Sequence, residues 1–178
     1  MVAMNRWTMR GAVLGAAAAA AAGIFAGPAL AAPAAHVYGA PVQARYHCLD
    51  DDTYWTFTWK IDAPVHAQVG GTVQLSVSGS LGVNKEGITI PAKAIDADLK
   101  VVLGGTQTGS VSATGLTNPT AQAPGEDRTM TGGTATVQLT SPGAVTFTPG
   151  TLTGHSASKT ANCEVVGSAP VSSVTAVW

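Results

Sequence analysis

Four neighbouring aromatic residues are the strongest candidates for a binding surface. Trp55, Phe57 and Trp59 occupy alternate positions, and Tyr54 stands next to them. Alternate side chains of a β-strand share one face, so the three would form an aromatic stripe with Tyr54 on the opposite face. An exposed stripe stacks on sugar rings or docks an apolar partner, whereas a buried one forms a core. We take all four as candidate ligand-binding residues, and both interpretations of the stripe stay open.

Outside this group, the sequence offers little that is typical of an enzyme. The nucleophile pattern Gly-x-Ser-x-Gly is missing, and no two histidines have the His-x-His or His-x-x-x-His spacing of a zinc site. Spacing alone identifies no carboxylate pair that resembles glycosidase machinery. We therefore predict a non-enzymatic protein with no catalytic residues, no metal site and no other cofactor.

Three consecutive acids, Asp50, Asp51 and Asp52, are the candidates for metal ligands. Neighbouring residues on a strand point to opposite faces, so only a turn would bring their carboxylates together around Ca²⁺. The run lacks the spaced acids and central glycine of an EF-hand loop. A solvated hairpin turn between a Cys48 strand and a Trp55 strand is the favoured interpretation, and calcium binding by that turn stays open.

The first residues have the pattern of a secretion signal. Arg6 and Arg10 precede an uncharged, alanine-rich segment, residues 11–27, and Ala29-Leu30-Ala31 gives a small-x-small cleavage site. A retained membrane anchor is the alternative, but alanine makes this segment weakly hydrophobic. We expect a signal peptide over residues 1–31 and a secreted, extracellular protein without a membrane anchor after cleavage, released or loosely associated with the cell wall.

The charge balance after the expected cleavage argues against some partners. Of nine Lys and Arg residues, Arg6 and Arg10 leave with the signal peptide, so seven basic residues face ten acidic ones and the net charge is −3. Binding to nucleic acid or to an anionic membrane surface requires clustered Lys and Arg. We therefore expect neither as a partner.

The two cysteines, Cys48 and Cys163, both follow the expected signal peptide. An even number of cysteines in an oxidising compartment favours pairing, so we predict one disulfide that closes a long loop. The alternative is two free, buried thiols.

The rest of the chain is typical of an all-β domain. Threonine, valine and serine are abundant, Gly- and Pro-containing turn signals recur at short intervals, and apolar and polar residues alternate, for example in 72–78 and 95–103. Strict alternation indicates antiparallel strands with one buried and one solvated face. The pattern predicts about eight or nine strands, arranged as two packed sheets or as one sheet closed on itself.

The strand pattern also suggests a division of the chain. We expect a flexible mature N-terminus over residues 32–44 and a single domain over residues 45–178. The stretch Thr117–Arg128 lacks periodicity and predicts a surface loop, while Pro91–Ile95 predicts a helical turn. We expect Trp178 to seal one end of the core.

A family resemblance rests on three short motifs. They are Tyr46-His47-Cys48 at the start of the domain, Phe147-Thr148-Pro149-Gly150 in a late strand pair, and a closing Cys163. In these the chain resembles small secreted actinobacterial immunoglobulin-like β-sandwich domains of unknown function. The resemblance implies a single immunoglobulin-like antiparallel β-sandwich in which Cys48 pairs with Cys163, and it implies no activity.

The sequence therefore favours a secreted, non-enzymatic module that binds an unknown extracellular or cell-wall partner or has a structural role in the cell envelope. One alternative is a carbohydrate-binding protein that uses Trp55 and Trp59. A second is an inhibitor of extracellular proteases, with Thr117–Arg128 as the bait loop and Arg128 or Lys85 as the anchoring side chain.

Overall fold

The computed structural model describes residues 37–85, 87–156 and 159–178, so the predicted signal peptide over residues 1–31 lies outside the described part. Within it the chain forms eleven strands and no helix. The strands are β1 (Val37–Tyr38), β2 (Val42–Cys48), β3 (Thr53–Pro64), β4 (His66–Ala67), β5 (Thr72–Val83), β6 (Ile95–Gly105), β7 (Gly109–Thr117), β8 (Asp127–Gln138), β9 (Gly143–Ser156), β10 (Lys159–Val165) and β11 (Ser173–Val177).

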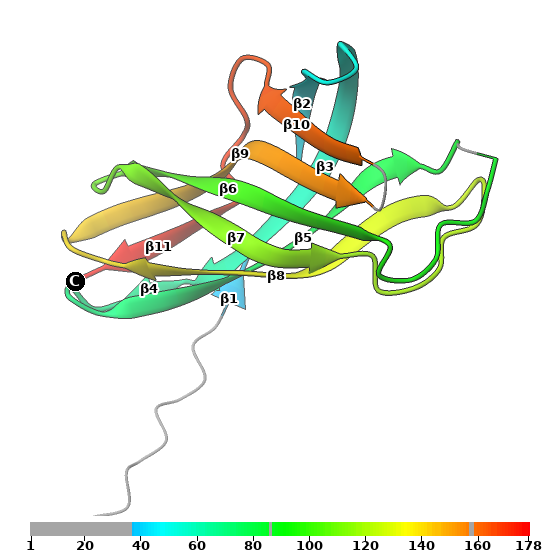
Figure 1. Cartoon of the computed structure of the whole chain (residues 1–178). Helices are drawn as coiled ribbons and strands as arrows, with labels where there is room; N and C mark the ends of the chain where they lie inside the picture. Colours follow the sequence, from blue (N-terminus) through cyan, green and yellow to red (C-terminus); the bar gives the residue numbers. More distant parts are fainter. Residues whose placement is uncertain (1–36, 86, 157–158) are drawn as a thin grey trace, which may run out of the picture. The chain divides into compact units, whose positions relative to one another are not determined.

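The strands belong to one hydrogen-bonded sheet that returns to its starting point (Figure 1). Eight strands follow in the order β10-β2-β3-β5-β8-β7-β6-β9, and β9 pairs with β10 again. All pairs in this ring are antiparallel, and β4 joins β11 in parallel. The all-β prediction is therefore confirmed. The described residues form one sheet rather than two separate sheets, and the immunoglobulin-like arrangement stays a prediction.

Side chains at the predicted inward-facing positions fill the space inside this sheet. In β5, Val73, Leu75 and Val77 are buried while the residues between them are exposed. Each such aliphatic side chain contributes roughly 1.5–3 kcal/mol when fully removed from water. The largest fully buried side chains are Trp59, Tyr46, Phe147, Ile61, Leu75, Leu99, Leu116, Met130 and Leu139.

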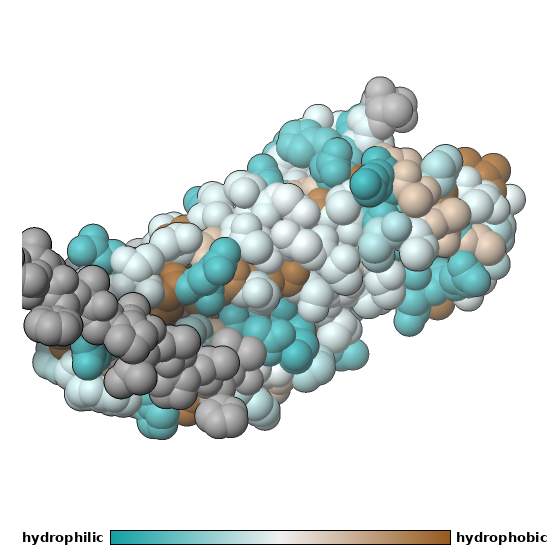
Figure 2. Space-filling view, turned by 90° about the horizontal axis from the view of Figure 1, so that it is seen from below, coloured by the Kyte–Doolittle hydropathy of each residue, from teal (hydrophilic) through white to brown (hydrophobic). Residues whose placement is uncertain are grey.

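The outward positions are dominated by small hydroxyl side chains. β8 alternates buried Ala135 and Val137 with exposed Thr134 and Thr136. The face seen from below Figure 1 is accordingly mostly pale in Figure 2, with strongly hydrophobic (brown) and strongly hydrophilic (teal) residues in separate groups. This arrangement is typical of a sheet with one face in a core and the other in water.

The domain begins earlier than the sequence indicated. β1 pairs with the end of β3, and β2 begins at Val42, three residues before the expected boundary at Arg45. A side chain at Gly39 would place its Cβ 2.2 Å from the carbonyl oxygen of Ile61, so this segment packs directly on β3. Residues 37–44 thus belong to the fold, which corrects the expected flexible N-terminus for this part.

The β5–β6 and β7–β8 loops pack together through buried amide side chains. The Asn118 amide accepts from Ile95 N at 2.9 Å and donates to Pro91 O at 2.6 Å. Asn84 donates to Gln122 O at 3.0 Å, which joins the β5–β6 loop to the β7–β8 loop. Both loops lie at the end of the molecule opposite the C-terminus in Figure 1. The segment 117–128 thus contains the predicted surface loop between β7 and β8, and the buried side chains of Asn118 and Gln122 fix this loop to the fold.

Two smaller predictions have different outcomes. Ala94 N donates to Pro91 O at 3.3 Å, so Pro91–Ile95 does contain a turn, although no helix forms there. Trp178 does not seal the core, because its side chain is 62% exposed and lies beside the His66 ring. No helix in the described residues is long and apolar enough to cross a membrane.

Candidate functional site: a cavity beside the disulfide

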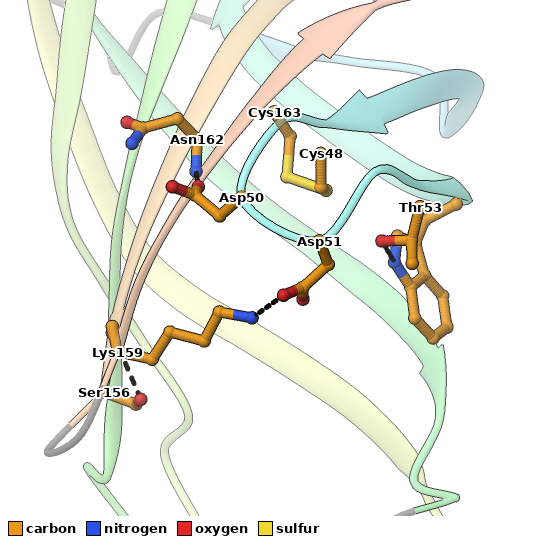
Figure 3. A network of polar contacts seen from close by, with 9 residues as sticks. Cys48, Asp50, Asp51, Thr53, Ser156, Lys159, Asn162 and Cys163 are labelled. Carbon is orange, nitrogen blue, oxygen red and sulfur yellow. Dashed lines mark hydrogen bonds and ion pairs between the residues drawn. A yellow bond between two sulfur atoms is a disulfide. The ribbon is translucent and has the colours of Figure 1, made fainter.

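The predicted disulfide is present and joins adjacent strands. Cys48 and Cys163 lie directly opposite each other on β2 and β10, with Cα atoms 3.9 Å apart. They are separated by 115 positions in sequence, so the bridge closes most of the domain into one loop. Figure 3 shows the bridge next to the β2–β3 hairpin turn, which holds Asp50 and Asp51, and to Asn162 of β10.

Each of the three acidic residues of that turn contacts a different partner. Asp50 accepts a hydrogen bond from Asn162 N, Asp51 forms an ion pair with Lys159, and Asp52 lies 2.7 Å from His47 Nε2. The described residues contain no group of three or more side chains that could hold a metal ion together. The hairpin turn predicted between Cys48 and Trp55 is present, and its carboxylates hold the turn against its neighbours.

Below this turn lies a cavity of about 260 Å³. Its floor is apolar and comes from distant parts of the sequence, because β3, β5, β6 and β9 each contribute a side chain at this end of the sheet. The lining residues are Cys48, Asp51, Trp55, Phe57, Leu81, Ile95, Arg128, Leu152, Gly154, His155, Ser156, Lys159, Ala161 and Cys163.

Trp55 stands at the mouth of this cavity. Its side chain is 37% exposed, and its indole N–H donates to Thr53 Oγ1 at 2.9 Å. The guanidinium carbon of Arg128 lies 5.4 Å from the centre of the indole ring, within the range of a cation–π interaction. Because the polar edge of the indole is already bonded, the part of Trp55 left for a ligand is apolar.

Arg128 is held by the protein rather than projecting from it. Its Nη2 donates to Leu81 O at 3.0 Å and its Nε donates to Gly82 O at 3.4 Å, so the guanidinium bridges β8 and β5. A protease-binding anchor has to protrude into the pocket of an enzyme. The geometry of Arg128 and the packed loop before it therefore argue against the proposed bait loop, while Lys85 remains an exposed lysine on the β5–β6 loop.

The aromatic stripe runs from the core to the surface. Trp59 and Phe57 are buried, and only Trp55 reaches the solvent. The core interpretation of the stripe therefore holds for Phe57 and Trp59, and the alternative in which Trp55 and Trp59 stack on a sugar together loses one of its two rings. Phe57 contributes to the cavity from its floor.

Tyr54 lies on the outer face, as the alternation predicted, and is 55% exposed. Its ring stacks on His47 with centroids 4.6 Å apart and lies 4.9 Å from the guanidinium carbon of Arg45. The side chain is thus engaged by two neighbours from β2, and it faces away from the cavity.

Two polar groups near the mouth have local partners. His155 Nδ1 lies 3.2 Å from Thr160 Oγ1, and Ser156 Oγ donates to Lys159 O at 3.2 Å. Both interactions join β9 to β10 at an exposed edge. Neither of these two contacts between described residues brings a serine hydroxyl together with an imidazole, which is the pairing that a serine nucleophile uses.

A second hollow of about 460 Å³ lies on the outer face, beside the loop that joins β10 to β11. Pro149, Gly150 and Gly167 form much of its surface, with Lys100 and Glu164 as its charged residues, and its lining contains no aromatic side chain. It offers less apolar contact than the cavity beside the disulfide, which is therefore the stronger candidate site.

Sequence reasoning missed most of the cavity. Leu81, Ile95, Leu152 and Lys159 were not among the candidate site residues, although all four line the cavity. These residues come together only because the ends of their strands are neighbours in space. The alternation of a strand shows which face a residue lies on, but not which strand ends are neighbours. The one available signal was that the predicted disulfide had to bring the Cys48 and Cys163 neighbourhoods together.

Comparison with known proteins provides no relative for this chain: no family model, no curated protein and no solved structure matches it.

Proposed function

We propose that this chain is an extracellular, non-enzymatic binding module whose ligand occupies the cavity beside the Cys48–Cys163 bridge. The observation that carries the proposal is Trp55, a large aromatic side chain kept partly in water at the mouth of an apolar cavity. Concave apolar sites with a few polar groups at the rim are the usual form of small-molecule sites in proteins.

The shape of the lining supports binding rather than catalysis. Phe57, Leu81 and Leu152 provide apolar contact, and the polar side chains at the rim are engaged in contacts between strands. A binding role needs only contact and orientation, whereas a catalytic role needs a nucleophile and a base within hydrogen-bonding distance of each other. The extracellular location rests on the expected signal peptide and agrees with the disulfide.

The test uses N-phenyl-1-naphthylamine, an uncharged dye whose fluorescence rises in apolar surroundings. We expect saturable binding to the purified protein and about tenfold weaker binding to Gly154→Leu, which corresponds to a loss of about 1.4 kcal/mol. Gly154 lines the cavity, and the nearest atom to a Cβ placed there, Ala161 O, is 4.0 Å away. The Cβ of a leucine therefore has room at this position, and the rest of the side chain takes up space in the cavity.

Thr136→Leu is the matched control, because Thr136 is exposed on the outer face of β8. It adds the same side chain outside the cavity and should leave dye binding unchanged, while thermal unfolding verifies that both variants fold. Saturable dye binding that Gly154→Leu leaves unaltered, or no saturable binding at all, would refute the proposed site.

A further inference from the structure

The rim of the cavity has charged side chains of both signs. Two of its lining residues, Arg128 and Lys159, are cationic and one, Asp51, is anionic. The chain as a whole has a net charge of −1. The rim therefore places two cationic side chains and one carboxylate beside an apolar floor.

Lys159 and Asp51 form an ion pair at the mouth of the cavity. Lys159 begins β10, Asp51 lies in the β2–β3 turn, and Figure 3 shows the lysine side chain extended toward the carboxylate. Both side chains are about half exposed, at 45% and 49%. Exposed ion pairs contribute little to stability, so a carboxylate from outside can replace that of Asp51 on Lys159 at small cost.

The volume of the cavity limits the size of the apolar part of a ligand that can lie on its floor. A volume of about 260 Å³ equals about nine water molecules at liquid density, which suits a body of about ten carbon atoms. Phe57, Ile95 and Leu152 supply apolar contact for such a body. A sugar ring would lose hydrogen bonds to water there without replacing them, because the floor is apolar.

We infer that the ligand is a small amphipathic carboxylate, with its apolar body on the floor beside Phe57 and Trp55 and its carboxylate on Lys159. The inference rests on the proposed function and names the ligand class for the same cavity. Asp51 then acts as an internal competitor, which occupies Lys159 when the cavity is empty and swings into solvent when the ligand binds.

The experiment compares decanoate with 1-decanol, which have the same chain and differ in charge, by displacement of N-phenyl-1-naphthylamine from the purified protein. We expect decanoate to bind more tightly than decanol. Lys159→Gln should weaken decanoate binding about threefold, the size expected for an ion pair to a half-exposed lysine. Asp51→Asn should strengthen it, because it removes the competing carboxylate. Decanol should bind all three proteins alike.

The two variants should change the affinity for decanoate in opposite directions, and this difference tests the inference. If the ion pair were only structural, both substitutions would change decanoate binding in the same direction. Lys100→Gln removes an exposed lysine from the outer face of β6 and should have no effect. Dye binding with equal affinities for decanoate and decanol would overturn this inference and leave the proposed function standing. Failure of the dye itself to bind would overturn both.

Discussion

Tyr46 reaches from β2 across the core, and its hydroxyl donates to Gly150 O on β9 at 2.9 Å. The side chain is fully buried. Burial raises the pKa of the Tyr46 phenol well above its ordinary value, and the neighbouring Trp59 indole opposes this shift. The fold therefore favours the neutral phenol, which keeps its proton at a pH where an unfolded tyrosine would lose it.

Tyr46→Phe tests this linkage. Below about pH 10, the ordinary pKa of tyrosine, the variant should be less stable than the parent by about 1–3 kcal/mol, because the buried Gly150 carbonyl loses its donor. Above that pH the unfolded state of the parent gains stability by ionising Tyr46, so the difference should shrink. Urea unfolding at pH 8 and pH 11 measures it.

Tyr38→Phe is the control for this experiment, because Tyr38 is exposed and should show no such change. A stability difference between Tyr46→Phe and the parent that is the same at both pH values would show that the phenol does not titrate differently in the folded and unfolded states.

Among the structural elements, the β5–β6 and β7–β8 loops behave as one unit. Asn118 is fully buried and bonds backbone groups of Ile95, Pro91 and Thr120. Asn118→Ala leaves these groups without partners and should cost about 1–3 kcal/mol. We expect faster amide hydrogen exchange in residues 88–95 and 118–126 together, while β2 and β10 keep their protection.

Thr120→Ala serves as the matched control, since Thr120 is exposed in the same loop and should leave exchange unchanged. If Asn118→Ala accelerated exchange only within its own loop, the two loops would not be coupled through this side chain.

Strand positions were predictable from alternation, but the relations between strand ends were not. The pattern placed Trp55, Phe57 and Trp59 on one face, and the structure adds that the face runs from the core to the solvent along β3. Periodicity carries no information about this gradient. The buried amides escaped detection for a related reason: Asn84 and Gln122 are partners 38 positions apart, and each looks like an ordinary loop residue in the sequence.

At the scale of the whole molecule, the single disulfide was predictable from the number of cysteines and the expected compartment, whereas the closure of the sheet was not. Alternation is the same whether strands form two sheets or one, so the sequence left both arrangements open. The sheet closes through β9. This strand is long enough to pair with β6 along one edge and with β11 and then β10 along the other.

The bridge should carry a large share of the stability. Joint replacement Cys48→Ala and Cys163→Ala opens a loop of 115 positions, which the chain-entropy account values at roughly 4–5 kcal/mol. Chemical unfolding of the parent and the double variant measures the difference. Reduction of the parent by dithiothreitol should reproduce the variant and should leave the variant itself unchanged. A loss of under about 1 kcal/mol would contradict the entropic role of the bridge.

The central claim is that the cavity beside the disulfide is the ligand site, and the tryptophans report on it directly. Trp55 stands at the mouth, Trp59 lies in the core, and Trp178, which follows β11, is exposed beside His66 of β4. In a two-dimensional ¹H–¹⁵N spectrum titrated with N-phenyl-1-naphthylamine, the indole signal of Trp55 should move most, and that of Trp178 should stay in place. Movement of the Trp178 signal with a stationary Trp55 signal would place the ligand elsewhere and contradict the account.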